Sequence, residues 1–263
     1  MTQPRRFPPI DERLLLQSVS RALDVIEAYS ESPRPKSLGE IAEAAGINRS
    51  AAQRIGQTLL SRGYLEQTPN GRLTLGRQLL DRSFDYLRSN ELIERAMPVL
   101  MDLRRATEER VDLSLFDAEH DSLSTVYAAR LQSKRETFYA TLAGRRQPTF
   151  ATSGGRACLA LLPDAAVDDI LSRSDLSPLT PRTVVTVAGV KARIEEARRL
   201  GYAWTLEEAL PGEVALAAAI RGPGGAPVGA IHVAGSLSEW TPDDFRARFA
   251  PLAVEAAAAL AAA

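Results

Sequence analysis

The sequence is poor in the residues that build redox and metal sites. It contains one cysteine, Cys158, and two histidines, His120 and His232, among 263 residues. A single cysteine excludes an internal disulfide and any site with several thiolate ligands. So few histidines argue against a catalytic metal centre. We therefore expect no metal and no cofactor, and we interpret Cys158 as a buried, inert thiol.

Long apolar runs are also missing. The longest is AAAALAAA at the C-terminal end, far short of the roughly 18 residues needed to cross a membrane. The first residues, MTQPRRFPPIDERLLL, contain arginines but neither the apolar core nor the cleavage site of a secretory signal. We expect a cytoplasmic protein with no membrane partner.

Lysine is scarce, and the charges that are present are unevenly distributed. There are 3 Lys against 29 Arg, and the net charge is −1. Residues 1–90 contain 13 basic and 10 acidic residues, whereas the remainder contains 19 and 23. Within 46–77 the balance is five basic residues to one acidic residue. A local basic surface on a nearly neutral protein indicates a polyanion-binding module joined to a second domain.

The N-terminal third has the pattern of a helix-turn-helix. An amphipathic helix is predicted at QSVSRALDVIEAY, with one apolar stripe formed by Val19, Leu23, Ile26 and Tyr29. A capping box, Ser37 with Glu40, begins the next helix. Gly46 allows a tight turn, because glycine adopts a positive φ at little cost. Asn48 is suited to cap the following helix, predicted over 49–62.

That third helix separates its apolar and polar residues. Ala52, Ile55 and Leu59 fall on one side, while arginine, serine and glutamine side chains fall on the other, near its N-terminus. The second helix of a helix-turn-helix enters the DNA major groove N-terminus first. Arginine and glutamine side chains are able to form bidentate hydrogen bonds with base edges.

Two short predicted strands, YLEQ and RLTL, follow this helix and flank the turn Pro69-Asn70-Gly71. Asn-Gly favours a hairpin, so this segment has the character of a wing, from which Arg72 would reach phosphate or the minor groove. The candidate DNA contacts are Ser20, Arg21, Ser37, Arg49, Ser50, Gln53, Arg54, Gln57, Asn70 and Arg72. The alternative is that these polar residues form an ordinary solvated helix face.

The remaining sequence predicts a linker and an α+β domain. An amphipathic helix over 76–90, with an apolar stripe of leucines and Phe84, would connect domains at 1–75 and 91–263. Pro98 should kink the next helix or start a new one. Strands are predicted at VDLSLFD, STVYAAR, ETFYATL, VALAAAIRG and VGAIHVAG, with helices near 153–162, 164–172 and 188–200 and after Thr241. The 222–227 segment GPGGAP is interpreted as a hairpin turn, which makes the sheet mainly antiparallel.

Four motifs together resemble IclR-type bacterial transcriptional regulators over about residues 14–260. They are QSVSRALDVIEAY, LGEIAEAAGINRSAAQRIGQTLLSRGYLEQ, ATSGGRACLALL and GYAWTLEEALPGEVALAAAI followed by GAIHVAG. The resemblance implies a winged helix-turn-helix joined to a GAF-like domain that binds a small, often carboxylated effector. It also implies a dimer, or a tetramer built as a dimer of dimers.

The resemblance further implies an effector site. Its candidate residues are Gln147, Thr152, Ser153, Gly154, Gly155, Thr205, Ala215, His232 and Ala234. Exposed amides at a helix N-terminus suit a carboxylate, although the same residues also fit a simple helix cap. His232 is either a structural histidine or an effector contact. In the second case effector affinity should rise below a pH near 6.5, where the ring is charged.

Our main hypothesis is a non-enzymatic, ligand-responsive regulator that binds double-stranded operator DNA as a homo-oligomer. Its effector would be a small molecule, in particular an organic acid. A first alternative is an enzyme domain that processes a small molecule and is fused to a degenerate winged helix. The lack of an evident acid–base pair near a nucleophile in the sequence argues against it. A second alternative is a winged helix that contacts only protein, which the basic excess over 46–77 disfavours.

Overall fold

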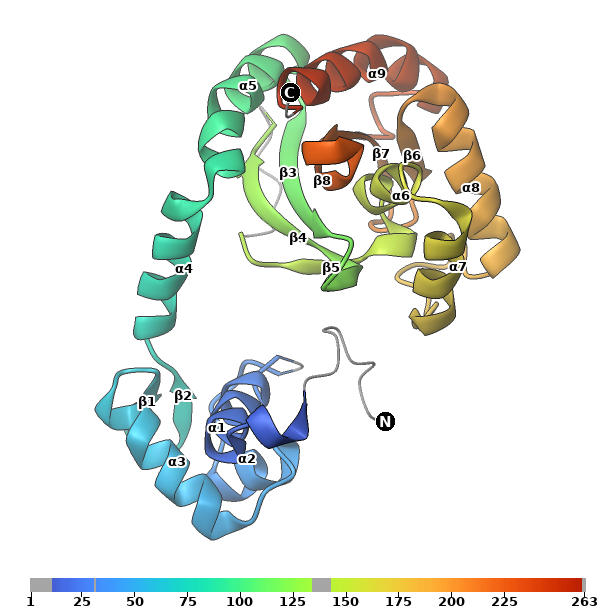
Figure 1. Cartoon of the computed structure of the whole chain (residues 1–263). Coiled ribbons are helices and arrows are strands. Elements are labelled where there is room, and N and C mark those ends of the chain that lie inside the picture. The colour runs from blue at the N-terminus through green and yellow to red at the C-terminus, as the bar shows by residue number, and fades with distance from the viewer. Residues whose placement is uncertain (1–10, 31, 134–142, 262–263) are drawn as a thin grey trace. The chain divides into compact units, whose positions relative to one another are not determined.

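The structure is a computed structural model that describes residues 11–30, 32–133 and 143–261. The chain forms two compact units that divide between Ser89 and Asn90 (Figure 1). In the described residues, no helix is both long enough and apolar enough to span a bilayer.

The first unit is a three-helix bundle with a two-stranded hairpin. Its elements are η1 (Glu12–Leu14), α1 (Gln17–Glu27), α2 (Leu38–Ala44), α3 (Arg49–Ser61), β1 (Leu65–Gln67), β2 (Leu73–Leu75) and α4 (Gln78–Ser89). Its core is built from Val25, Tyr29, Ile41, Ala42, Ala52, Leu59, Leu65 and Leu73. One small core therefore holds the first three helices and the hairpin together.

The predicted local signals define these elements. Ser37 and Glu40 form both hydrogen bonds of a capping box at the start of α2. Asn48 caps α3 through a 2.8 Å hydrogen bond from the Ala51 amide. The hairpin turns at Gly71, whose φ is +79°, a backbone conformation that glycine adopts at little cost.

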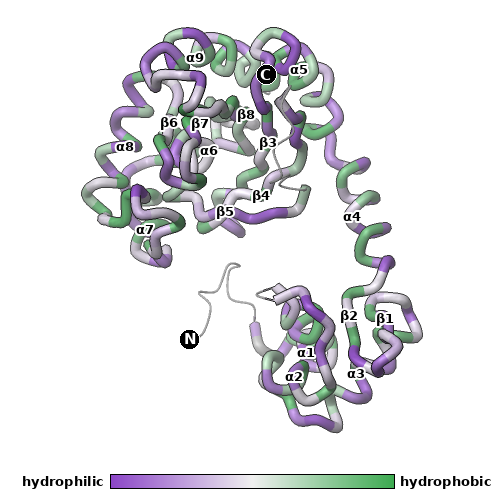
Figure 2. Tube along the Cα trace, turned by 180° about the vertical axis from the view of Figure 1, so that it is seen from behind, coloured by the Kyte–Doolittle hydropathy of each residue, from purple (hydrophilic) through white to green (hydrophobic). Residues whose placement is uncertain are grey.

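Two apolar stripes differ from their prediction. Val19 and Leu23 of α1 are 52% and 53% exposed, and the buried side of this helix is centred on Val25 and continues to Tyr29. In α4, Leu80 and Phe84 are exposed, and no residue of this helix is buried. Green and purple segments alternate along α4 in Figure 2, as expected for an amphipathic helix. The periodicity identified helices correctly, but it did not show that these apolar sides are left exposed by the residues that the structure describes.

Over the residues that the structure describes, the second unit is a six-stranded antiparallel sheet between two helical layers (Figure 1). Its strands are β3 (Arg110–Asp117), β4 (Asp121–Leu131), β5 (Arg146–Pro148), β6 (Ala203–Leu206), β7 (Glu213–Arg221) and β8 (Pro227–Ser236), in the order β5-β4-β3-β8-β7-β6. One face packs against α5 (Glu91–Thr107) and α9 (Pro242–Ala259). The other packs against α6 (Ser153–Leu159), behind which lie α7 (Asp164–Arg173) and α8 (Val187–Leu200).

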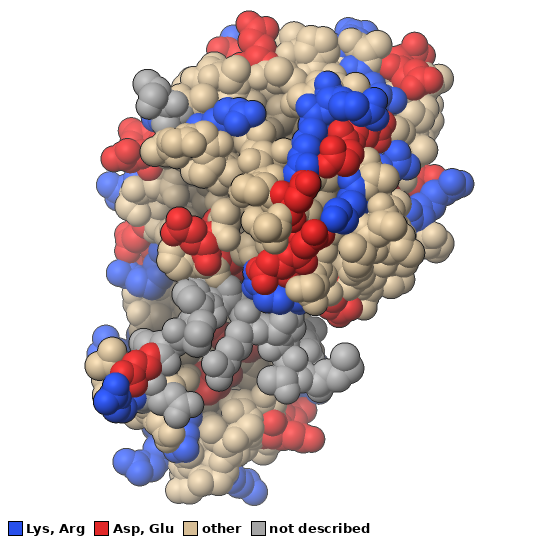
Figure 3. All heavy atoms as spheres, turned by 45° about the vertical axis from the view of Figure 1, so that its right-hand side comes forward, with Lys and Arg blue, Asp and Glu red and all other residues tan. Residues whose placement is uncertain are grey.

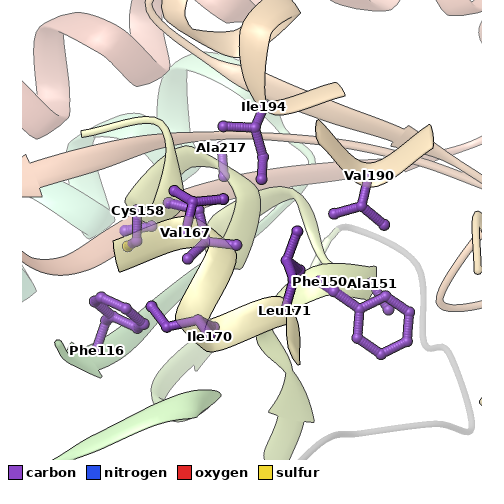
Figure 4. Close-up of a cluster of buried hydrophobic side chains, with 12 residues drawn as sticks. Phe116, Phe150, Ala151, Cys158, Val167, Ile170, Leu171, Val190, Ile194 and Ala217 are labelled. Carbon is purple, nitrogen blue, oxygen red and sulfur yellow. The ribbon is translucent and has the colours of Figure 1, made fainter. Parts of the chain in front are cut away.

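The core on the α6 side fixes this helix on the sheet. Phe150, Cys158, Ile170 and Ile194 belong to one buried cluster with Ala217 of β7, several of them drawn in Figure 4. Burial raises the pKa of the Cys158 thiol, so the thiolate is suppressed, in agreement with the interpretation of an inert cysteine.

On the surface seen in Figure 3, acidic and basic side chains lie beside one another instead of forming patches of one sign.

One local prediction for this unit needs correction. α5 begins at Glu91 and is capped by Asn90, whose side chain accepts a 3.1 Å hydrogen bond from the Ile93 amide, and the helix continues through Pro98. Of the two outcomes predicted for Pro98, the start of a new helix is therefore wrong, because the helix starts at the asparagine cap. The short strands β5 and β6 were not predicted, since three or four residues are too few to show a period. The predicted strand ETFYATL, residues 136–142, lies outside the described residues.

Candidate functional site

One side of α3 is a polar surface supported by an apolar underside. Ala52, Gly56 and Leu59 are buried against the core of the first unit. The opposite side exposes the predicted contacts Arg49, Ser50, Gln53, Arg54 and Gln57. Among the described residues, no carboxylate pairs with Arg49 or Arg54. Their positive charge is therefore not compensated locally.

A groove of about 350 Å³ runs between α1 and α3 beside this surface. Ala51 and Leu59 form part of its wall, and Arg21 and Arg54 contribute to its lining together with the hydroxyl-bearing Ser18 and Thr58. Ser20, another predicted contact on α1, is partly buried. The two arginines and the Ser18 hydroxyl can donate hydrogen bonds to phosphate oxygens, whereas the Thr58 hydroxyl already donates to the Arg54 carbonyl at 3.0 Å.

The wing differs from its predicted role. Arg72 does not extend from the hairpin, because its Nε donates to the Pro35 carbonyl at 3.0 Å and its Nη2 donates to Glu40. The Ser37 hydrogen bonds and the charge of Arg72 lower the pKa of Glu40 to about 2. Asn70 accepts a hydrogen bond from the Thr68 hydroxyl within the turn. In this structure Arg72 joins the wing to α2, whereas Ser37 caps α2 and Asn70 bonds within the turn.

In the second unit, four predicted effector residues lie on the sheet face that carries α6. Thr205, Ala215 and Ala234 are consecutive partners across β6, β7 and β8. His232, two residues before Ala234, shares its face. Gln147 pairs with Thr125 at the opposite edge of the sheet, so the structure does not bring it into this row.

The start of α6 is packed closely against its surroundings. Thr152 caps the helix through a 3.1 Å hydrogen bond from the Gly155 amide. A Cβ at Gly155 would lie 2.1 Å from the Thr149 carbonyl oxygen, and one at Gly154 would lie 2.2 Å from the His232 ring. The glycines are therefore explained by close packing, and the His232 ring covers Gly154. A larger side chain at 154 would displace buried His232 rather than fill an open pocket.

His232 is a buried, neutral histidine. Its Nε2 lies 2.7 Å from Ser114 Oγ and its Nδ1 lies 3.5 Å from Ser153 Oγ. Its ring centroid is 5.1 Å from that of Tyr127. Burial lowers the pKa of His232 to about 4. The expected change in effector affinity near pH 6.5 is therefore wrong for this structure, since the ring is already neutral there.

The Ser114–His232 contact is a hydroxyl–imidazole pair that was not evident from the sequence. Ser114 is fully buried and His232 is 2% exposed. The second ring nitrogen faces the hydroxyl of Ser153 and not a carboxylate. A nucleophile–base pair works when a third group orients the base and a substrate reaches the nucleophile. A structural role suits His232 better, since it joins β8 to β3 through Ser114 and to α6 through Ser153.

A buried charge network beside His232 was missed by sequence reasoning. Asp112 accepts hydrogen bonds from Arg130 at 2.6 and 2.9 Å and from Arg110 at 3.1 Å. Arg110 also bonds Glu213 at 2.6 Å. Burial alone would lower the pKa of Arg110, but Glu213 and Asp112 raise it above its usual value. The signal was present in VDLSLFD, where alternation places an acidic residue on the face of Ser114.

Arg110 lies next to Ala234 in the sheet register, so this charge network borders the Thr205–Ala215–Ala234 row. Small side chains beside charged groups are a composition found in small-molecule sites. Among the described residues, no three His, Cys, Asp or Glu side chains are grouped to hold a metal ion.

Known proteins share both units. The family described as "Bacterial transcriptional regulator IclR C-terminal" matches residues 84–262, and the "IclR helix-turn-helix domain" matches residues 18–69. The glycerol operon regulatory protein of Streptomyces griseus is 30% identical, with the match covering 87% of this chain and 88% of that protein. The transcriptional repressor IclR of Escherichia coli (strain K12) is 27% identical, covering 92% of this chain and 88% of that repressor.

A solved structure shows the same architecture. The crystal structure of a candidate transcriptional regulator from Rhodococcus sp. RHA1 has a TM-score of 0.78 and 30% sequence identity, covering 94% of this chain and 97% of that chain. With its helix-turn-helix, its α+β second unit and family matches to both, the chain belongs to the IclR family of bacterial transcriptional regulators.

Proposed function

We propose that this protein is a ligand-responsive regulator that binds double-stranded operator DNA and controls a metabolic operon in the cytoplasm. The polar side of α3 carries the proposal. Arg49, Gln53, Arg54 and Gln57 are exposed on a helix whose other side belongs to a core. This arrangement fits a recognition helix whose N-terminal residues contact base edges in the major groove.

The remaining contacts divide by chemistry. Gln53 and Arg49 are suited to base edges. Arg21 and Arg54 are suited to phosphates, because they line one groove with two hydroxyl-bearing residues. Ser37, Asn70 and Arg72 would act mainly by keeping the wing in place, since their side chains bond within the first unit. Ser20 and Ser50 complete the proposed interface.

We propose a homo-oligomer as the functional form. Leu14, Leu16, Val19 and Leu23 are exposed along η1 and α1, as are Leu80 and Phe84 of α4. Exposed apolar side chains on successive elements are characteristic of protein interfaces. A dimer would cover these side chains and present two copies of α3 to two half-sites. The effector would change the populations of the dimer geometries that fit the operator.

The effector site is proposed on the α6 side of the sheet, where Thr205, Ala215, Ala234 and His232 lie near the charge network. The guanidinium groups of Arg110 and Arg130 are suited to a small organic acid that competes with Asp112 and Glu213 for them. Thr152, Ser153, Gly154 and Gly155 would shape this site from α6. Gln147 would contribute only from the opposite edge of the sheet. No catalytic role is proposed.

The test is a comparison of two charge-matched variants on an operator selected from random DNA. Arg49→Ala and Arg62→Ala each remove one exposed arginine of the α3 region, one at the start of the helix and one just beyond its end. Arg49→Ala and Gln53→Ala should weaken specific binding by about 1–3 kcal/mol and relax one base preference. Arg62→Ala should retain that preference. Equal effects of Arg49→Ala and Arg62→Ala in fluorescence anisotropy titrations would contradict the recognition role of α3.

A further inference from the structure

A cavity of about 470 Å³ lies at the end of β7, and it does not include the Thr205–Ala215–Ala234 row. The pairing of β6 with β7 ends at Ala203 and Ala217. In the described residues, β7 therefore continues over 218–221 with no strand beside it on that side. Here α6 and α9, which cover opposite faces of the sheet, both border the same open space. The cavity is the consequence of β6 being shorter than β7.

The walls of this cavity are apolar because alanine recurs on every element around it. It is lined by Ala157 of α6 and Ala160 just after that helix, by Ala218 and Ala219 of β7, and by Ala257 and Ala258 of α9. A methyl side chain at each position leaves a volume that larger apolar residues would fill. Its size lies within the roughly 300–1,000 Å³ of small-molecule sites, which are mostly apolar and carry few polar groups.

The charged side chains that line the cavity are both arginines. Arg221, at the end of β7, is exposed, and its Nη1 lies 3.5 Å from the Gly225 carbonyl oxygen. No described carboxylate pairs with it. Tyr202 adds a phenol hydroxyl. Arg198 also lines the cavity, but its donors bind Asp164 and the Ala160 and Leu162 carbonyls. Arg221 is thus the cation placed to receive a ligand.

We propose that this cavity is a second small-molecule site, which binds a monocarboxylate with an aliphatic body. The aliphatic part would lie against the alanines of α6, β7 and α9, and the carboxylate would pair with Arg221. An apolar cavity of this kind gains free energy by exchanging water contacts for a hydrocarbon surface, and the guanidinium supplies orientation. The proposal is independent of the effector site, which lies at the other end of α6.

The experiment titrates the full-length protein calorimetrically with octanoate, octan-1-ol and octylamine below their aggregation concentrations. We expect one molecule of octanoate per chain, weaker binding of octan-1-ol, and the weakest binding of octylamine, whose charge Arg221 repels. Arg221→Gln should lower octanoate affinity about tenfold, because it removes a charge-assisted hydrogen bond. The same variant should leave octan-1-ol affinity within about twofold.

A matched pair of variants locates the site. Ala258→Phe places a ring in the cavity, whereas Ala259→Phe alters its exposed neighbour, which does not line the cavity. Ala258→Phe should abolish octanoate binding, and Ala259→Phe should preserve it. Unchanged binding by Ala258→Phe, equal loss in both variants, or no binding by the folded wild type would overturn the proposal. Because none of these variants lies in the first unit, operator binding reports separately on the function proposed above.

Discussion

Two pairs of arginines, one in each unit, have opposite surroundings. On α3, Arg49 and Arg54 are exposed and no described carboxylate pairs with them. On the sheet, Arg110 and Arg130 are largely buried and bound to Asp112. An exposed charge without a partner attracts a polyanion at little cost to stability. A buried charge must be paired, because removing it from water without compensation is expensive.

This contrast predicts different consequences for the same type of substitution. Removing a charge on α3 should change binding and leave the fold intact. Removing a charge from the sheet network should instead lower the free energy of unfolding. Tryptophan fluorescence separates the two, since both tryptophans, Trp204 and Trp240, belong to the second unit.

The largest expected effect is that of Asp112→Asn. Asp112 is 1% exposed and accepts hydrogen bonds from two arginines. Replacing its carboxylate leaves Arg130 and Arg110 without that negative charge, which should lower the free energy of unfolding by about 3–5 kcal/mol. Urea unfolding followed by tryptophan fluorescence measures the loss.

Its control is Asp102→Asn, which removes the carboxylate of the exposed Asp102–Arg105 pair. Surface pairs contribute little, so the unfolding midpoint should barely move. Similar losses in the two aspartate variants would contradict the importance of burial in the sheet network.

The next effect is a pH dependence carried by His232. The folded state keeps its pKa at about 4, against an ordinary value of 6.5. Between these values the unfolded chain binds the proton and the folded chain does not, so stability falls as the pH is lowered from 6.5 to 4. The total is about 3 kcal/mol, and it is fully present above pH 6.5.

His232→Gln should remove this component, whereas His120→Gln, in an exposed turn, should retain it. Urea unfolding of the second unit at pH 7, 5.5 and 4.5 compares the two variants with wild type. A wild-type pH profile in His232→Gln would show that the buried ring is not its source.

A smaller effect concerns the salt dependence of operator binding. Arg21 and Arg54 line the groove between α1 and α3. If each neutralises one phosphate, Arg21→Ala and Arg54→Ala should each reduce the slope of log affinity against log salt by about one. Arg105→Ala, an exposed arginine of α5, serves as the control and should leave the slope unchanged. Anisotropy titrations from 50 to about 200 mM salt give the slopes.

The smallest effect is expected at the start of α2. Ser37→Ala removes the hydroxyl that accepts from the Glu40 amide at 3.3 Å. Loss of an N-cap costs about 1 kcal/mol, and unfolding of the first unit should show it by circular dichroism. Ser30→Ala, at an exposed position outside the cap, should change little. Destabilisation of the second unit by Ser37→Ala would contradict the local nature of the cap.

Short-range signals made the first unit largely predictable. The Ser37–Glu40 box, the Asn48 cap and the Gly71 turn act within a few residues, so the sequence shows them directly. The exposed side of α3 was predictable for the same reason, because its underside follows the helical period. The exposure of Val19 and Leu23 was not, since periodicity cannot show which apolar side another element covers.

The effector face was less predictable because its contacts cross the sheet. His232 and Ser114 are 118 residues apart in sequence, and Asp112 and Arg130 are 18 apart on neighbouring strands. Alternation placed His232 with Ala234 correctly. It could not show that Ser114 and Gly154 enclose the ring, or that burial keeps this ring neutral.

The sequence by itself determined the helix-turn-helix, the antiparallel α+β domain and the absence of an internal disulfide. These follow from local hydrogen-bonding residues, from hydrophobic periods and from a single cysteine. Only the tertiary structure decided that Arg72 holds the wing to α2, that His232 lies on Gly154, and that two arginines share Asp112. The physical reason is that charge pairing and desolvation depend on which groups are close in space. The register of the strands determines which side chains are neighbours across the sheet.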